Sequence, residues 1–171
     1  RTHLQEARLH TLIDKIEAVS GWKKRKKNEG YGVAITECFA STVAQVVKVS
    51  KRPSGGVQID QVWAVMDCGW YVNPDTIKAR IEGSIVMALG AATMHEVQFQ
   101  DGKAVDNNFS TYQLPRITDI PPIEIHIMEN DEDAGGVGEP ALPPFAPALT
   151  NAIFDLTGKR IRKLPFRLEG V

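Results

Sequence analysis

The fold of this chain is decided by residues 31–66, which read YGVAITECFA STVAQVVKVS KRPSGGVQID QVWAVM. β-Branched and aromatic residues are dense in this stretch, and the turn sequence Pro53-Ser54-Gly55-Gly56 interrupts it. The part after the turn alternates apolar and polar residues, apart from a slip at Gln61 and Val62. The pattern predicts three consecutive strands that pair antiparallel as a β-meander.

Helices are predicted on both sides of the meander. Residues 2–20 carry apolar residues at helical spacing, and Gly21 is suited to end that helix in the left-handed conformation. Asn73-Pro74-Asp75 supplies a cap, a first-turn proline and an acidic residue for a second helix that runs to about Met94. Residues 81–92 of that helix are apolar nearly all round and include small residues, so we expect it to be buried.

The remaining elements are short. Residues 99–103 predict a hairpin with an Asp-Gly turn, and residues 123–127 alternate like a strand that is wet on one face. A last helix is predicted over Pro147–Thr157, and residues 161–166 read as a final short strand. This order of elements predicts an α+β (mixed α/β) fold, with residues 1–171 as a single domain.

Composition narrows the class of protein. The chain has 171 residues, 43% of them hydrophobic and 24% charged, which suffices for one domain with a real core. A formal net charge of −1 argues against a general nucleic-acid binder. The basic run Lys23–Lys27 is interpreted as a solvated loop, with phosphate or nucleic-acid binding as the alternative. No apolar run approaches the about 20 residues that a membrane span requires.

The glycine-rich stretch AGGVGEP at residues 134–140 is the most informative candidate site. Three glycines in four positions are useful where the backbone adopts positive φ or presses against a ligand. Pro140 stiffens the exit, so Glu139 is held on a constrained turn. A carboxylate held in this way and shielded from water would have a raised pKa and could act as a general base. The alternative is a surface turn with an incidental glutamate.

Other reactive residues are expected to be structural. The four histidines lack the spacing of a metal site. They are His3, His10, His95 and His126. Cys38 and Cys68 are too few for a four-thiolate zinc or iron–sulfur site, and Cys68 reads as a small buried residue rather than a ligand. An acidic run resembles a loose calcium loop without its full spacing, which favours a solvated loop. Its members are Glu129, Asp131, Glu132 and Asp133. No metal ligand is therefore assigned in this chain.

Several sequence blocks, taken together and in order, carry a family resemblance. They are Gly32-Val33-Ala34 with Glu37, Val43-Ala44-Gln45-Val46, Val65-Met66-Asp67-Cys68-Gly69 with Val72-Asn73-Pro74, Ile81-Glu82-Gly83, Gly136-Val137-Gly138-Glu139-Pro140, Leu142-Pro143-Pro144, Ala146-Pro147-Ala148, Asn151-Ala152-Ile153-Phe154 and Thr157-Gly158-Lys159-Arg160. These blocks resemble the C-terminal part of the molybdopterin-binding large (β) subunit in the xanthine dehydrogenase (molybdenum hydroxylase) family. The resemblance is closest to the branch of isoquinoline 1-oxidoreductase and related bacterial aldehyde dehydrogenases.

The resemblance implies an enzyme that oxidises an N-heterocycle or an aldehyde at an electron-poor carbon. In this family the oxygen derives from water, hydride passes to a molybdenum sulfido ligand, and a loop glutamate takes the proton from the metal-bound hydroxyl. Glu139 matches that catalytic glutamate, and Gly136, Val137 and Gly138 match the cofactor-binding loop. The implied cofactor is molybdenum–molybdopterin in its cytosine dinucleotide form. We expect it to be absent from this chain alone, which would then be inactive.

The resemblance also implies partners. They are the N-terminal remainder of the same subunit, a small iron–sulfur subunit and the heterocycle or aldehyde substrate. Because the sequence begins with Arg1, we expect a piece of a longer chain, and bacterial cytoplasm and periplasm both remain open. Many relatives have Gln where this chain has Arg80, which either contacts the cofactor or faces solvent. The alternative function is a non-catalytic binding or assembly module on the same fold.

Overall fold

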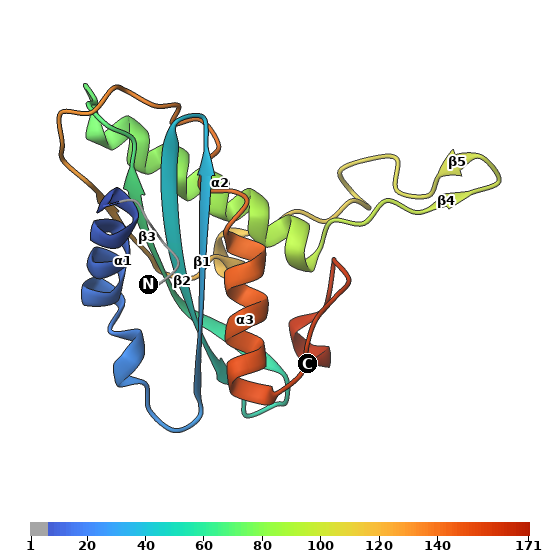
Figure 1. The fold of residues 1–171 in the computed structure, drawn as a ribbon. Coiled ribbons are helices and arrows are strands. Elements are labelled where there is room, and N and C mark those ends of the chain that lie inside the picture. Colours follow the sequence, from blue (N-terminus) through green and yellow to red (C-terminus); the bar gives the residue numbers. More distant parts are fainter. Residues whose placement is uncertain (1–6) are drawn as a thin grey trace.

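The computed structural model describes residues 7–171 (Figure 1). Its elements in chain order are α1 (Ala7–Ser20), β1 (Glu29–Cys38), β2 (Ser41–Lys51), β3 (Val57–Asp67), α2 (Pro74–Thr93), β4 (Phe99–Gln100), β5 (Lys103–Ala104), β6 (Ile123–Ile127) and α3 (Phe145–Thr157). Three short 3-10 helices lie at Trp22–Lys24, Ile117–Asp119 and Leu168–Gly170. The first residues of the helix predicted over 2–20, and His3, lie outside the described residues.

The main sheet has the strand order β1-β2-β3-β6. The predicted antiparallel meander of β1, β2 and β3 is confirmed, and β6 adds to β3 in parallel. Lys48 pairs with Gln61 while Val49 pairs with Ile59, so Asp60 is the extra residue of a β-bulge. The bulge accounts for the slip in alternation seen in the sequence, because one extra residue reverses the face of every side chain after it.

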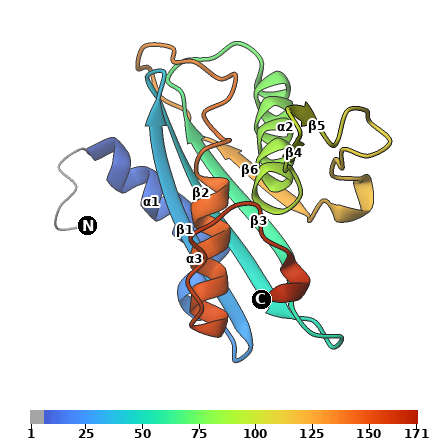
Figure 2. The same ribbon diagram turned by 90° about the vertical axis from the view of Figure 1, so that its right-hand side faces the viewer.

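Helices cover both faces of this sheet (Figure 2). α2 and α3 pack on the face that carries Val43 and Val47, whereas α1 packs on the face that carries Ala44 and Val46. β2 is therefore buried on both sides, which explains its nearly unbroken apolar sequence. α3 crosses β1 very closely, since a Cβ at Gly32 would lie 2.0 Å from the carbonyl oxygen of Ala148.

The second helix, α2, begins where the sequence predicts, with the Asn73 side chain accepting from two amides of the first turn. The expectation that it is buried holds for one face only. Ile85 and Leu89 are fully or almost fully buried, but Met87 is 56% exposed and a Cβ at Gly83 would meet nothing within 4 Å. α2 contacts α3 and β6 on one side, and no described residue covers its opposite face.

Two predictions about the C-terminal region change. α3 begins at Phe145, two residues before the predicted start, and ends as expected at Gly158 in the left-handed conformation. The strand predicted over residues 161–166 is wrong. The backbone there is irregular, and the Phe166 amide donates to the carbonyl of Ala92 at the end of α2 (3.0 Å) instead of to a strand.

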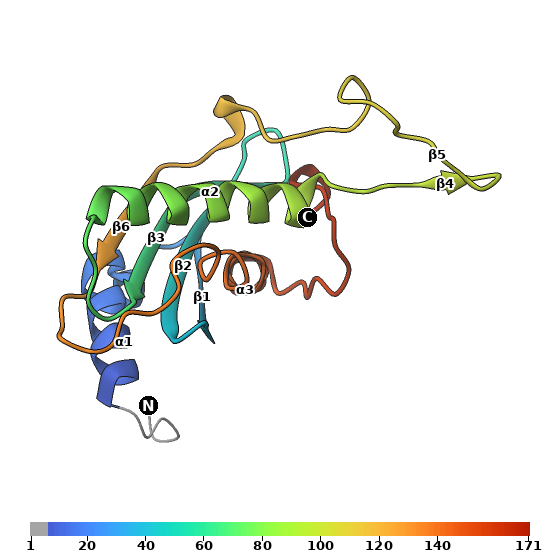
Figure 3. The same cartoon turned by 90° about the horizontal axis from the view of Figure 1, so that it is seen from above.

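The segment between α2 and β6 extends away from the body of the molecule and carries the predicted hairpin (Figure 3). Strands β4 and β5 pair across Asp101 and Gly102, both of which have positive φ (50° and 75°). We call residues 95–121 the arm. Among residues 7–171, no helix combines the length and the apolar character that a bilayer crossing needs.

Candidate active site

The glycine-rich loop lies across one end of the sheet, over the β1–β2 turn and the end of β3 (Figure 1, orange). Two of its amides attach it to those strands. The Gly135 N–H donates to the Cys68 carbonyl (2.8 Å), and the Gly136 N–H donates to the Phe39 carbonyl (2.7 Å). Segments that are 67 and 97 positions apart in the sequence are thus joined to the loop by backbone hydrogen bonds.

None of the three glycines of this loop has positive φ, and two of them are needed for close approach. A Cβ at Gly135 would lie 2.3 Å from Ser41 Oγ and 2.5 Å from the Ala40 carbonyl oxygen. A Cβ at Gly136 would lie 2.8 Å from the Cβ of Phe39. Gly135 and Gly136 therefore press against the β1–β2 turn.

The exit of the loop is fixed by a buried side chain. Gln45 on β2 is fully buried, and its Nε2 donates to the Ala141 carbonyl at 2.6 Å. Pro140 is buried, and the Leu142 amide donates to the Glu139 carbonyl (3.0 Å). The backbone on both sides of Glu139 is therefore held in place by the sheet.

The Glu139 side chain itself is exposed. The shielding from water that the sequence interpretation assumed is absent within residues 7–171, because no described element packs over the loop at this point. The carboxylate nevertheless acts on its surroundings: the pKa of the Cys38 thiol is raised first by burial and then by the negative charge of Glu139. Glu139 and the end of β1 are thus close enough to interact.

The loop also offers free backbone donors. The amides of Val137 and Gly138 donate to no acceptor in the described part of the chain. A Cβ at Gly138 would meet nothing within 4 Å, so this side of the loop is open. Two N–H groups beside a carboxylate form a small polar surface that can bind the oxygen atoms of a ligand.

An ion pair with a buried carboxylate supports the strand end beneath the loop, and the sequence interpretation did not identify it. Asp67 is 4% exposed and accepts from Arg8 on α1, from Asn130 Nδ2 (2.9 Å) and from the Gly69 amide (3.2 Å). Burial alone would raise the pKa of Asp67, but these hydrogen bonds outweigh it and hold the pKa below its usual range. The one signal in the sequence was a carboxylate directly after the apolar run Val62–Met66.

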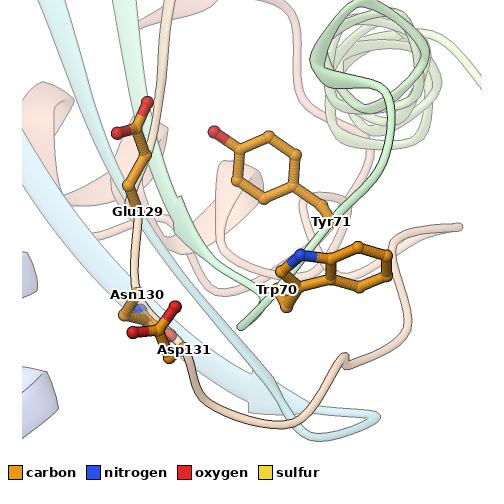
Figure 4. Close-up of a pocket in the computed structure, with 5 residues that line it drawn as sticks. All are labelled: Trp70, Tyr71, Glu129, Asn130 and Asp131. Atoms are coloured by element: carbon orange, nitrogen blue, oxygen red, sulfur yellow. The ribbon is translucent and has the colours of Figure 1, made fainter.

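A shallow hollow of about 430 Å³ lies beside the loop, lined by Trp70 and Tyr71 on one side and by residues 129–131 on the other (Figure 4). Burial raises the pKa of Tyr71, and the charge of Glu129 adds to the effect. The Trp70 amide donates to the Glu132 carbonyl (2.8 Å). This hydrogen bond joins one wall of the hollow to the segment that leads into the glycine-rich loop.

The structure does not bring the other candidates into this site. Cys68 is buried, as predicted, and burial raises the pKa of its thiol. Arg80 is exposed on α2, and the basic run is an exposed loop in which Lys23 pairs with Glu17 (2.7 Å) and Arg25 with Asp155.

His95 and His126 are likewise separate from the glycine-rich loop, whereas the acidic run leads into that loop, and its Glu129 and Asp131 line the hollow beside it. His95 packs against Tyr112, and His126 shares a hydrogen bond with Glu124 (2.8 Å). Within residues 7–171, no three His, Cys, Asp or Glu side chains converge as metal ligands.

A family model and several known proteins match this chain. The family model of the molybdopterin cofactor-binding domain matches residues 7–121. The isoquinoline 1-oxidoreductase subunit beta of Brevundimonas diminuta is 32% identical over 161 residues, which is 91% of this chain and 21% of that subunit. The molybdenum-binding subunit PaoC of the Escherichia coli aldehyde oxidoreductase is 32% identical over 124 residues, or 68% of this chain and 17% of that subunit. The chain thus spans about a fifth of the length of these relatives.

Solved structures agree with the sequence matches. The quinoline 2-oxidoreductase of Pseudomonas putida 86 superposes with a TM-score of 0.66 at 25% identity, over 73% of this chain and 17% of that one. The aldehyde oxidoreductase of Desulfovibrio gigas gives a TM-score of 0.65 at 25% identity, over 79% of this chain and 16% of that one. The chain therefore belongs to the molybdopterin cofactor-binding domain family, within the xanthine oxidase type of molybdenum oxidoreductases.

Proposed function

We propose that this chain is part of the large subunit of a molybdenum hydroxylase and that Glu139 is the general base of that enzyme. The reaction converts a C–H bond of an N-heterocycle or an aldehyde into C–OH, with oxygen from water and release of two electrons and two protons. The observation that carries the proposal is the loop itself. Its backbone is fixed to the sheet on both sides of Glu139, while the carboxylate and Gly138 remain open.

The residues at the loop fit the cofactor that the family binds. The free N–H groups of Val137 and Gly138 can donate to its oxygen atoms, and the open side of Gly138 leaves room for the close approach of a large group. We propose the cytosine dinucleotide form of molybdopterin. When bound, this group supplies a two-electron oxidising centre.

Glu139 has a defined task in this scheme. One carboxylate oxygen accepts a proton as the new C–O bond forms, and the fixed backbone keeps that oxygen in one place between turnovers. In the complete subunit, the cofactor and the remaining chain would cover the carboxylate.

The proposed partners follow from the length of the relatives, of which this chain covers only about a fifth. The remainder of the large subunit completes the site, and a small iron–sulfur subunit takes up the two electrons. The names of two relatives, a subunit beta and a molybdenum-binding subunit, support the proposal that the enzyme consists of separate subunits. A non-catalytic binding or assembly module is the competing proposal.

The test is Glu139→Gln in the full-length enzyme. An amide fills the same space, so molybdenum content should be unchanged. Turnover should fall by about 10²–10⁴-fold, and the loss should appear in the reduction of the enzyme by substrate. Glu132→Gln, which changes another exposed glutamate of the same connection, should leave that rate unchanged.

Reduction of Glu139→Gln at near wild-type speed would show that Glu139 is not the base and would favour the non-catalytic module. If Glu139→Gln instead loses molybdenum while Glu132→Gln retains it, Glu139 serves cofactor retention.

A further inference from the structure

We propose that Phe39, at the tip of the β1–β2 turn beside the glycine-rich loop, selects planar aromatic substrates by packing its ring against them. The proposal rests on the proposed function, because it places the substrate at Glu139. It adds to the proposed site a residue from the β1–β2 turn, whereas Glu139 lies on the glycine-rich loop. It also adds a preference for aromatic substrates within the broad class of heterocycles and aldehydes.

The conformation of this turn is unusual for its residues. Phe39 and Ala40 both have positive φ, 55° and 57°, which is the geometry that two-residue hairpin turns usually give to Asn and Gly. For a residue with a Cβ this conformation is unfavourable, and for a bulky one it is a genuine outlier. The large ring is nevertheless 64% exposed, so burial of its apolar surface does not explain it. Strained residues of this kind cluster at ligand sites.

The glycine-rich loop packs against the backbone and Cβ of Phe39, while most of the ring is exposed to solvent. The Phe39 carbonyl accepts from the Gly136 amide at 2.7 Å. A Cβ placed on Gly136 would lie 2.8 Å from the Phe39 Cβ and 3.6 Å from its Cγ, so the loop is shaped around the beginning of this side chain. A fixed aromatic ring can bind a flat ligand at a low entropic cost.

Two links place this ring next to the proposed base. Gly136, which touches Phe39, precedes Glu139 by three positions on the same fixed loop. Cys38, which directly precedes Phe39, has a thiol whose pKa is raised by burial and then by the charge of Glu139. Trp70 is also exposed at this end of the sheet, but it lines the separate hollow beside residues 129–131.

The chemistry of the ring predicts the preference. Offset stacking or edge-to-face packing of two aromatic rings stabilises a complex beyond the burial of apolar area. An aliphatic chain of similar size gains only the burial. A heteroaromatic ring or an aryl aldehyde should therefore be favoured over an aliphatic aldehyde that has the same reacting group.

The experiment compares Phe39→Ala, Phe39→Tyr and wild-type in the full-length, cofactor-loaded enzyme. Benzaldehyde and isoquinoline are the aromatic substrates, and butyraldehyde is the aliphatic one. Phe39→Ala should lower kcat/KM for the aromatic substrates about tenfold relative to butyraldehyde, and Phe39→Tyr should restore it. Phe109→Ala removes an exposed ring from the arm (84% exposed, against 64% for Phe39) and should change neither value.

A second readout does not depend on turnover. Calorimetric titration of isoquinoline into the oxidised enzyme, with its reaction blocked by Glu139→Gln, should show about tenfold weaker binding when Phe39→Ala is added. Equal losses for aromatic and aliphatic substrates, or unchanged isoquinoline binding, would overturn the proposal.

The two proposals can also be told apart. Glu139→Gln should slow all three substrates together, whereas Phe39→Ala should slow only the aromatic ones. Glu139→Gln could leave the enzyme active while the added Phe39→Ala still slows only the aromatic substrates. That result would refute Glu139 as the general base and would support the role of Phe39 in substrate selection.

Discussion

Arg8 and Asp67, 59 positions apart, form a two-point ion pair at the end of β3, with distances of 2.9 Å from Nε and 2.6 Å from Nη2. The pair connects α1 to the strand end that lies beneath the glycine-rich loop. Asn130, which leads into that loop, donates to the same carboxylate. One buried acidic side chain thus joins three separate segments of the chain.

Asp67→Asn should destabilise the fold by about 1–3 kcal/mol at pH 7, because Arg8 and Asn130 lose a charged acceptor. The pKa of Asp67 is lower in the folded than in the unfolded chain. Its contribution is therefore present above the unfolded pKa of about 4 and is lost as the pH falls through the lower folded pKa. Urea unfolding of wild-type and variant at pH 7 and pH 3 should show a difference that shrinks at pH 3. An equal difference at both pH values would contradict this linkage. Glu82→Gln, at an exposed position on α2, is the control.

Leu89→Ala should cost about 2–5 kcal/mol, because Leu89 is 2% exposed in the core between α2, α3 and the sheet, and its loss leaves a cavity. Met87→Ala on the same helix removes a side chain that is 56% exposed and should cost well under about 1 kcal/mol. Urea midpoints with unchanged slopes measure both. Equal costs for the two variants would mean that α2 does not face the core in this way.

Gly135→Ala should destabilise the chain by about 1–3 kcal/mol, because the new Cβ would collide with Ser41 Oγ and with the backbone of Ala40. Gly138→Ala adds the same methyl group to open space, so its effect on unfolding should lie within about 1 kcal/mol of zero or be slightly stabilising. In the full-length enzyme, however, Gly138→Ala should lower molybdenum content, since the methyl group occupies the open side of the loop. Full molybdenum loading of that variant would remove Gly138 from the cofactor site.

The chain alone should fold and carry no molybdenum. It has a core on both faces of its sheet, but it spans only about a fifth of its relatives, and its loop offers two free amides and one carboxylate. Circular dichroism and cooperative urea unfolding test the first part, and elemental analysis tests the second. The full-length subunit from the same host is the reference, and near-stoichiometric metal in the isolated chain would disprove the prediction.

Local signals predicted most of the secondary structure. The apolar alternation between residues 31 and 66, the turn glycines and the cap at Asn73 each act over a few residues, and the structure has an element at each of them. The strand predicted over residues 161–166 is wrong because that prediction also used only a local signal. Its apolar residues match a local pattern, but a strand also needs a partner edge, and the Phe166 amide pairs with the end of a helix.

The sequence by itself determined the meander, the start of α2 at its Asn73 cap, the glycines that follow α1 and α3, the family and the candidate glutamate, because each depends on residue type and pattern. Only the tertiary structure decided what the glycines of the loop touch, since Gly135 and Gly136 meet the β1–β2 turn almost 100 positions earlier. It also decided the parallel pairing of β6 with β3, the Arg8–Asp67 pair and the exposure of Glu139 and Phe39. These features depend on contacts between distant segments, and such contacts are fixed only when the sheet and its helices pack together.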